Sequence, residues 1–186
     1  HFWLLVFSTV LIAAAGNIIN DYFDTRIDRI NKPDEVIVGR TVKRRVAMTA
    51  HMLLSGMGLV IGAFVAWRSG LLKLTWIPLF SIAALWLYST NLKRSLVIGN
   101  VLVATLTALV PLSVGLYEIP LLAKLFADPV VIAAGGEAYQ MEAGFIIELW
   151  WWVLGFAGFA FLSSLVRELQ KDMADVKGDA AVGCRT

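Results

Sequence analysis

Cysteine and histidine, the residues that most often build thiol or imidazole sites, are nearly absent from this sequence. The single cysteine, Cys184, excludes an internal disulfide, and two histidines, His1 and His51, are too few for a histidine-based metal centre. His51 stands inside an apolar run, so we expect it to pack within a helix rather than to bind a ligand.

Charge is scarce as well: 16% of the 186 residues are charged and 59% are hydrophobic, with a mean hydropathy of +0.74. A soluble domain carries about a quarter charged residues. The apolar residues gather in five nearly uncharged stretches, whose length of about twenty residues matches a hydrocarbon core of roughly 30 Å. These are Phe2–Ile19, Val46–Trp67, Leu74–Leu87 (about twenty residues when extended to 71–90), Leu96–Tyr117 and Phe145–Val166. Because the stretches have no polar outer face, they predict an all-α polytopic transmembrane helical bundle rather than a soluble one.

The basic residues indicate how the bundle is oriented. Thirteen of the sixteen Lys and Arg residues flank the same ends of these spans, and only Arg68, Lys73 and Lys124 flank the opposite ends. By the positive-inside rule the basic side is cytoplasmic, which predicts an integral membrane protein of a bacterial or archaeal cell membrane with membrane lipids, and no nucleic acid, as its surroundings. The acidic connection over 118–143 is then expected to be an external loop.

The ends of the chain favour a truncated domain. The sequence begins with His1 inside an apolar run and stops at Thr186 directly after a charged segment. We therefore expect a single transmembrane domain over residues 1–186 with helices missing at both ends.

A first acidic cluster follows the first apolar stretch. On a helix at about 100° per residue, five polar side chains share an arc of about 100°: Asn17, Asn20, Asp21, Asp24 and Asp28. Crowded carboxylates repel one another, and the nearby Arg26 and Arg29 point away from this arc. Mg²⁺ prefers oxygen ligands and commonly takes one or two carboxylates together with phosphate oxygens. The pattern therefore favours a Mg²⁺ and phosphate site over simple decoration of a helix end.

A second acidic cluster, Glu168, Asp172, Asp175 and Asp179, follows the fifth stretch. Gly178 indicates that its helix frays there. Both clusters end helices that run in the same direction, so they are expected to face one cavity on the cytoplasmic side. Two carboxylate sets with Mg²⁺ would hold a diphosphate, and nearby cations could bind its remaining oxygens: Arg40, Lys93, Arg94 and Lys171.

These motifs resemble the UbiA prenyltransferase superfamily. Asn20-xxx-Asp24-xxx-Asp28 with Asn31-Lys32-Pro33 and Gly39-Arg40 is similar to the first signature of that family, and Asp175-xxx-Asp179 is similar to the second. Two further segments between these motifs resemble the same family. Its tyrosine and lysine segment resembles Leu87-Tyr88-Ser89 with Leu92-Lys93-Arg94, and its Gly-Asn pair resembles Gly99-Asn100. The resemblance implies a bundle of nine helices, of which this chain would hold about five.

The resemblance also implies the activity, the transfer of a polyprenyl group from its Mg²⁺-bound diphosphate to an acceptor. Asp24, Asp28, Asp175 and Asp179 would be the catalytic metal ligands, and the substrate would be bound by Asn20, Asp21, Arg40, Tyr88, Lys93 and Lys171. Lys171 stands where many members that modify aromatic rings carry tyrosine. Arg167-Glu168 ahead of Lys171-Asp172 looks more like the branch that joins geranylgeranyl diphosphate to geranylgeranylglycerol phosphate.

Other functions stay open at this stage. An aromatic acceptor of quinone or haem biosynthesis is one alternative, and another small-molecule or lipid acceptor is possible within the same reaction. A divalent-cation transporter is an alternative from another class, although transporter carboxylates lie near the bilayer midplane. A CDP-alcohol phosphotransferase would carry a compact motif beginning with Asp-Gly, and that motif does not occur here.

Overall fold

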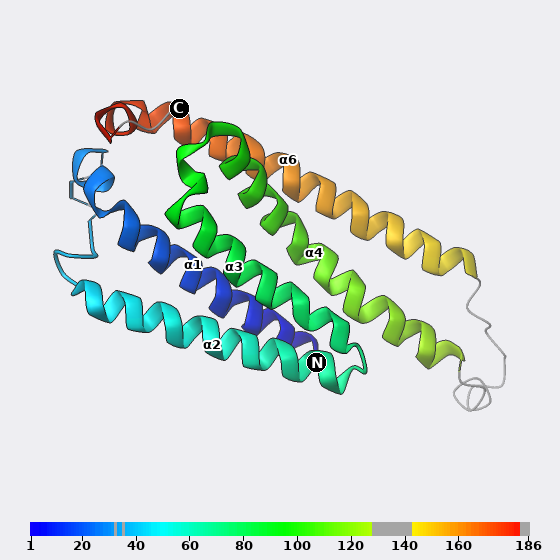
Figure 1. Ribbon diagram of the computed structural model, residues 1–186. Helices are drawn as coiled ribbons and strands as arrows, with labels where there is room; N and C mark the ends of the chain where they lie inside the picture. The colour runs from blue at the N-terminus through cyan, green and yellow to red at the C-terminus, as the bar shows by residue number, and fades with distance from the viewer. Residues whose placement is uncertain (32, 35, 128–142, 183–186) are drawn as a thin grey trace.

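The computed structural model of the chain is a bundle of long helices (Figure 1). It describes residues 1–127, apart from 32 and 35, and residues 143–182, although side chains from 175 onward and a few others lie outside this description. The main helices are α1 (Phe2–Asn31), α2 (Arg44–Arg68), α3 (Trp76–Thr90), α4 (Leu96–Ala127) and α6 (Ala143–Val182), with short 3₁₀ turns η1 (Leu72–Thr75) and η2 (Leu92–Arg94) around α3. No strand occurs within these described ranges, so the all-α prediction is confirmed.

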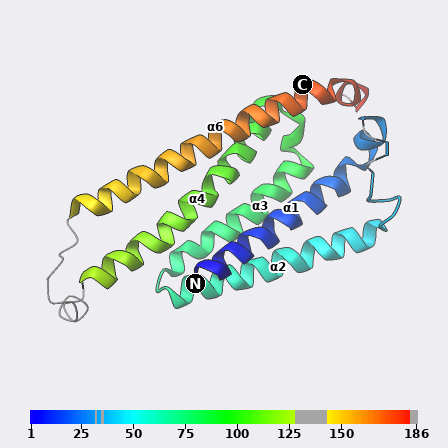
Figure 2. The same cartoon turned by 180° about the vertical axis from the view of Figure 1, so that it is seen from behind.

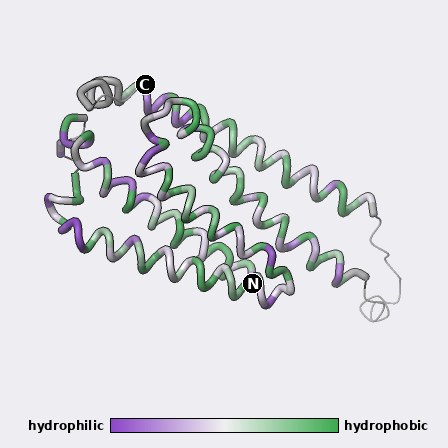
Figure 3. Tube along the Cα trace, in the orientation of Figure 1, coloured by the Kyte–Doolittle hydropathy of each residue, from purple (hydrophilic) through white to green (hydrophobic). Residues whose placement is uncertain are grey.

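Five helical segments are long and apolar enough to cross a membrane, and they coincide with the five predicted stretches. Their bounds are Phe2–Thr25, Arg44–Arg68, Leu72–Thr90, Val97–Leu125 and Gly144–Ala174. Hydrophilic residues gather where α1 ends, where α2 begins and around η2 (Figure 3). The long central parts of the helices are apolar, which is the distribution expected of membrane-spanning segments.

Two predicted boundaries were wrong. The connection after the fourth span was expected to begin at Glu118, but α4 continues to Ala127 and includes Pro120. A proline inside a membrane helix is tolerated because neighbouring groups satisfy the freed carbonyl. In the second acidic segment, Gly178 does not end α6, whose backbone stays helical to Val182. A single glycine costs only about 1 kcal/mol in a helix, and the surrounding residues outweigh that cost.

Two groups of helices make up the bundle. Helix α1 packs against α2 and α3, α4 packs against α6, and α1 also contacts α4 and α6. The C-terminal ends of α1, α3 and α6 lie at one end of the bundle together with the beginnings of α2 and α4 (Figures 1 and 2). This end is the basic side identified in the sequence, so the alternation of the five spans is confirmed.

The contact between α1 and α2 is close because small residues line it. The Ser8 hydroxyl donates a hydrogen bond to the Gly58 carbonyl oxygen at 2.7 Å. Two turns away, His51 is buried with Nδ1 2.9 Å from the carbonyl oxygen of Ala15. His51 is therefore a packed helix residue, as predicted. Small residues let membrane helices approach and form such polar contacts between helices.

We expect valine at position 58 to separate α1 from α2. A Cβ atom at Gly58 would lie 2.7 Å from Cγ1 of Ile12 and 3.2 Å from the carbonyl oxygen of Ser8, whereas a Cβ atom at the exposed Gly56 would meet nothing within 4 Å. Gly58→Val should lower the free energy of unfolding in detergent by about 1–3 kcal/mol through overpacking. Gly56→Val is the matched control and should change it by less than about 0.5 kcal/mol. Equal losses in the two variants would contradict this account.

Candidate active site

The first acidic cluster lies on the last turns of α1, which stays helical to Asn31 as predicted. The structure separates its three carboxylates by environment: Asp24 is buried, Asp28 is half-buried and Asp21 is exposed. A buried carboxylate needs a charge partner or several hydrogen bonds. Asp24 is therefore the centre from which the site can be built.

The partner of Asp24 is Lys93, whose Nζ donates to Oδ2 of Asp24 in an ion pair. The sequence prediction assigned the compensating positive charge to a metal ion, and the structure shows that part of it comes from this lysine. Lys93 is brought there by the η2 turn, which folds back on the first turn of α4. A Cβ atom at Gly99 would lie only 2.8 Å from the Leu92 carbonyl oxygen and 3.3 Å from Cε2 of Tyr88. Glycine at this position therefore lets the η2 turn pack directly against the first turn of α4.

Helix α6 contributes the opposite wall of the site. Its Lys171 lies within electrostatic range of both Asp21 and Asp28. Asn100 at the start of α4 is buried, and its Nδ2 donates a 2.6 Å hydrogen bond to Oδ2 of Asp172. Residues just before the second acidic motif therefore lie near α4 and the first acidic cluster.

Tyr88 and Glu168 form the deeper part of the cluster. Tyr88, at the end of α3, is buried, and the carboxylates of Glu168, Asp24 and Asp172 act on it electrostatically. Glu168 is also buried and accepts a 2.7 Å charged hydrogen bond from Nη2 of the exposed Arg167. Four helices and the η2 turn thus supply side chains to one polar cluster.

Electrostatics within the cluster favour the binding of further positive charge. Burial raises the pKa of the Asp28 carboxyl above its ordinary value, and the neighbouring carboxylates of Asp24 and Asp21 raise it further. Lys93 and Lys171 act in the opposite direction and lower this pKa. Because the raising effects outweigh the lowering ones, an additional cation beside Asp28 would relieve an unfavourable charge.

Three of the predicted site residues are not placed in this cluster by side-chain contacts. The side chains of Asp175 and Asp179 lie outside the described residues, although the α6 backbone that carries them is helical and ends at the same end of the bundle. Arg40 is exposed in the connection between α1 and α2, where its Nη1 donates to the Pro33 carbonyl oxygen at 3.1 Å. Arg40 therefore belongs to this connection and not to the buried part of the site.

One unpaired atom bears on the predicted Mg²⁺. Oδ1 of Asn20 is buried and has no hydrogen-bond partner among the described residues. In the same part of the chain, no three His, Cys, Asp or Glu side chains lie close enough together to form a preformed metal cage. Mg²⁺ usually needs only one or two carboxylates beside waters and substrate phosphates. The orphaned amide oxygen and the neighbouring carboxylates fit that kind of donor set.

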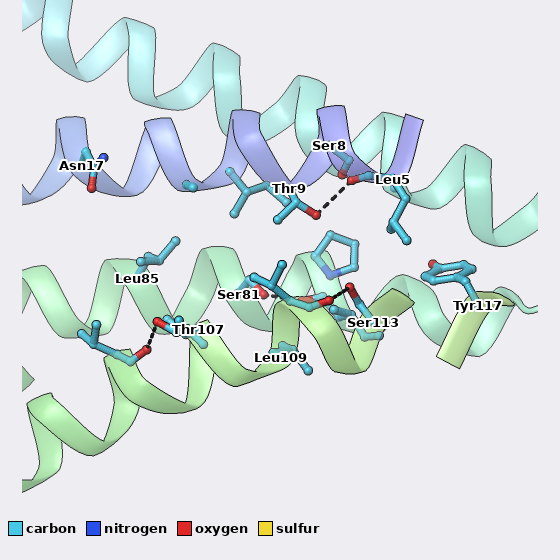
Figure 4. A pocket seen from close by; sticks show the side chains of 18 of the residues that line it. Leu5, Ser8, Thr9, Asn17, Ser81, Leu85, Thr107, Leu109, Ser113 and Tyr117 are labelled. Carbon is cyan, nitrogen blue, oxygen red and sulfur yellow. Dashed lines mark hydrogen bonds between the residues drawn. The ribbon is translucent and has the colours of Figure 1, made fainter. Parts of the chain in front are cut away.

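A cavity of about 290 Å³ lies in the bundle beside this cluster, and its lining includes Asn17, one turn before Asn20 on α1, and Arg167, next to Glu168 on α6. Asn17 lines one end of the cavity, and Leu5 and Tyr117 line the opposite end (Figure 4). The walls between them come from α1, α3 and α4, with Gly62 of α2. One end of the elongated cavity therefore lies about one helical turn from the polar cluster.

Hydroxyl groups line part of this cavity, but they do not make it polar. Those of Thr9, Ser81, Thr107 and Ser113 donate to carbonyl oxygens of their own helices, at distances of 2.8–3.0 Å. With their donors used in this way, these residues present mainly methyl and methylene groups to the cavity. The cavity can accept a long apolar group and offers few new hydrogen bonds to a polar one.

Sequence reasoning missed the partners that hold the cluster together. It noted the Gly99-Asn100 pair only as part of a resemblance, and it placed Asp172 in the second acidic cluster without a partner. The signal that could have found them is a buried amide next to a glycine at the start of an apolar helix, opposite a second acidic helix end. The ion pair between Lys93 and Asp24 joins residues far apart in the chain, and no periodic pattern reveals it.

Comparison with known proteins agrees with this arrangement. The model of the UbiA prenyltransferase family matches residues 1–186. Three similar curated proteins carry the name digeranylgeranylglyceryl phosphate synthase. The protein of Metallosphaera sedula is 34% identical over 96% of this chain and 52% of its own length. The protein of Methanoregula boonei is 34% identical and that of Pyrococcus abyssi 32% identical, each over 98% of this chain and 54% of the relative's length.

The chain thus spans about half the length of the curated relatives that it matches. No solved structure matches it. The family match covers every residue, including both acidic segments and the connecting Tyr88 and Lys93, and the chain belongs to the UbiA prenyltransferase family.

Proposed function

We propose that this chain forms the donor-binding half of a membrane prenyltransferase, which moves a polyprenyl group from its diphosphate to an acceptor. The observation that carries the proposal is the junction between a cluster of carboxylates and lysines and a long apolar cavity. A prenyl diphosphate has the same two parts, a highly charged head and an apolar tail. Each part of the junction matches one of them.

The head would be bound with Mg²⁺. Asp24, Asp28, Asp175 and Asp179 are the proposed ligands, with Asn20 offering its unpaired amide oxygen. When bound, Mg²⁺ neutralises the charge of the diphosphate as a Lewis acid and makes it a better leaving group. Asp21, which is exposed at the edge of the cluster, would support the binding of the donor from there.

Lysine side chains would bind the oxygens that remain. Lys93 and Lys171 lie beside the α1 carboxylates from two different elements, so they can contact a diphosphate from two sides. Arg40 is proposed as a further contact from the connection between α1 and α2. Charge-assisted hydrogen bonds of this kind are roughly twice as strong as neutral ones.

The reaction that follows is an alkylation. The allylic C–O bond of the donor breaks and its electron pair leaves with the diphosphate. A hydroxyl oxygen of the acceptor then bonds to the allylic carbon and gives up its proton. The carbon carries positive charge in between, and the buried face of Tyr88 could stabilise it by about 1–2 kcal/mol. The apolar cavity excludes water that would otherwise capture the cation.

Geranylgeranylglycerol phosphate is the acceptor that we propose. The three relatives are named for digeranylgeranylglyceryl phosphate, which is the product of adding geranylgeranyl to that acceptor. Lys171 beside Asp172, in place of the tyrosine of many ring-modifying members, supports the same branch. The excess of basic residues at this end of the bundle supports a site that faces the cytoplasm.

An acceptor panel tests the proposal. The complete protein, reconstituted in vesicles with Mg²⁺ and geranylgeranyl diphosphate, should alkylate geranylgeranylglycerol phosphate at least about a hundredfold faster than an aromatic acid. Chelation of divalent metal should abolish the reaction. Faster alkylation of the aromatic acid would assign the protein to the ring-modifying members. Metal flux across the vesicles without any prenyl transfer would favour a transporter and refute the proposal.

A further inference from the structure

One aromatic side chain lies at the far end of the apolar cavity. Tyr117 of α4 lines the cavity and has only 2% of its surface exposed. It packs into an apolar cluster with Leu5, Val65 and Ala66, against which Leu71 and Leu74 also pack. Its ring lies at the end of the cavity opposite Asn17, and its hydroxyl points toward the interior (Figure 4).

The hydroxyl of Tyr117 has no hydrogen-bond partner among the described residues. This distinguishes it from the serine and threonine hydroxyls of the cavity wall, which donate to backbone carbonyl oxygens. A buried hydroxyl without a partner costs free energy, so packing alone would favour phenylalanine at this position. The bulk of the ring, and not the hydroxyl, is what fills this end of the cavity.

The length of the cavity itself is set by the helices. Between Asn17 and Leu5, α1 rises by about 18 Å at 1.5 Å per residue. That is roughly the length of an extended chain of about four isoprene units, since each C–C bond of about 1.5 Å advances such a chain by about 1.2 Å. A longer chain would meet the ring of Tyr117.

We infer that Tyr117 sets the upper length of the prenyl donor by closing the apolar cavity. The inference rests on the proposed function, because it treats the cavity as the site of the prenyl tail. If the ring is removed, the space that opens is walled by Leu5, Val65 and Ala66 together with Leu71 and Leu74. This space is apolar, so it can accept a further isoprene unit.

The test compares donors of different length in the complete protein. For each variant, the initial rate with a five-unit prenyl diphosphate is divided by the rate with the four-unit donor. Tyr117→Ala and Tyr117→Leu should raise this ratio about tenfold or more, as expected when an apolar pocket gains a matching slot. Tyr117→Phe keeps the ring and should keep the wild-type ratio.

A second variant opens the same space from α1. Leu5→Ala removes a neighbour of the ring and should raise the ratio in the same direction, so the inference can be tested even if Tyr117→Ala does not fold. Folded and active Tyr117→Leu and Leu5→Ala proteins with the wild-type ratio would overturn the inference and leave the proposed function intact. A wild-type protein that transfers neither donor would remove the proposed function and this inference with it.

Discussion

Replacing Asp24 by alanine should lower the rate of prenyl transfer about a thousandfold, which corresponds to roughly 4 kcal/mol of lost transition-state stabilisation. Asp24 is buried at the centre of the polar cluster and is paired with Lys93. The substitution removes a proposed metal ligand and also leaves a half-buried lysine without its partner. The measurement is the initial rate with saturating Mg²⁺ and labelled geranylgeranyl diphosphate in the complete protein.

The matched control is Asp34→Ala. Asp34 is exposed in the connection after α1 and lies outside the cluster, so its loss should change the rate by less than about twofold. Exchanging the charges in Asp24→Lys with Lys93→Asp separates the two roles of Asp24. The exchange restores an ion pair but not a carboxylate on α1, and activity should stay low. Recovery of the wild-type rate in the exchanged protein would show that Asp24 serves only the ion pair.

Replacing Asp175 by alanine should cost about as much as replacing Asp24, and the double variant should be little worse than either single one. Residues that act as one unit show such non-additive losses. We expect Asp24 and Asp175 to act together because of where α6 lies. Lys171 and Asp172, one turn before Asp175, lie in electrostatic or hydrogen-bonding range of residues on α1 and α4.

The control for this prediction lies on the same helix. Glu148 is an exposed acid near the opposite end of α6, and Glu148→Gln should leave the rate within about twofold. If the losses of Asp24→Ala and Asp175→Ala multiply in the double variant, the two acidic segments serve separate functions. The proposal of a single site on one donor would then be wrong.

The packing of the α1 carboxylates shows where periodicity stops being informative. The helical arc correctly placed Asp21, Asp24 and Asp28 on successive turns of one helix. It could not rank them, because burial depends on which neighbours cover each position. Lys93 covers Asp24 from a turn that closes only because residue 99 is glycine. That turn depends on tertiary contacts between α3 and α4.

The sequence by itself determined the membrane-spanning helices, their alternating direction and the two acidic helix ends at the basic side. These features follow from local properties, namely apolar length, helical period and the distribution of charge. Only the tertiary structure decided that Lys93 pairs with Asp24, that Asn100 binds Asp172 and that a cavity runs from Asn17 to Tyr117. Each of these depends on side chains from helices distant in the chain, and apolar helices in a membrane have many possible partners until packing selects among them.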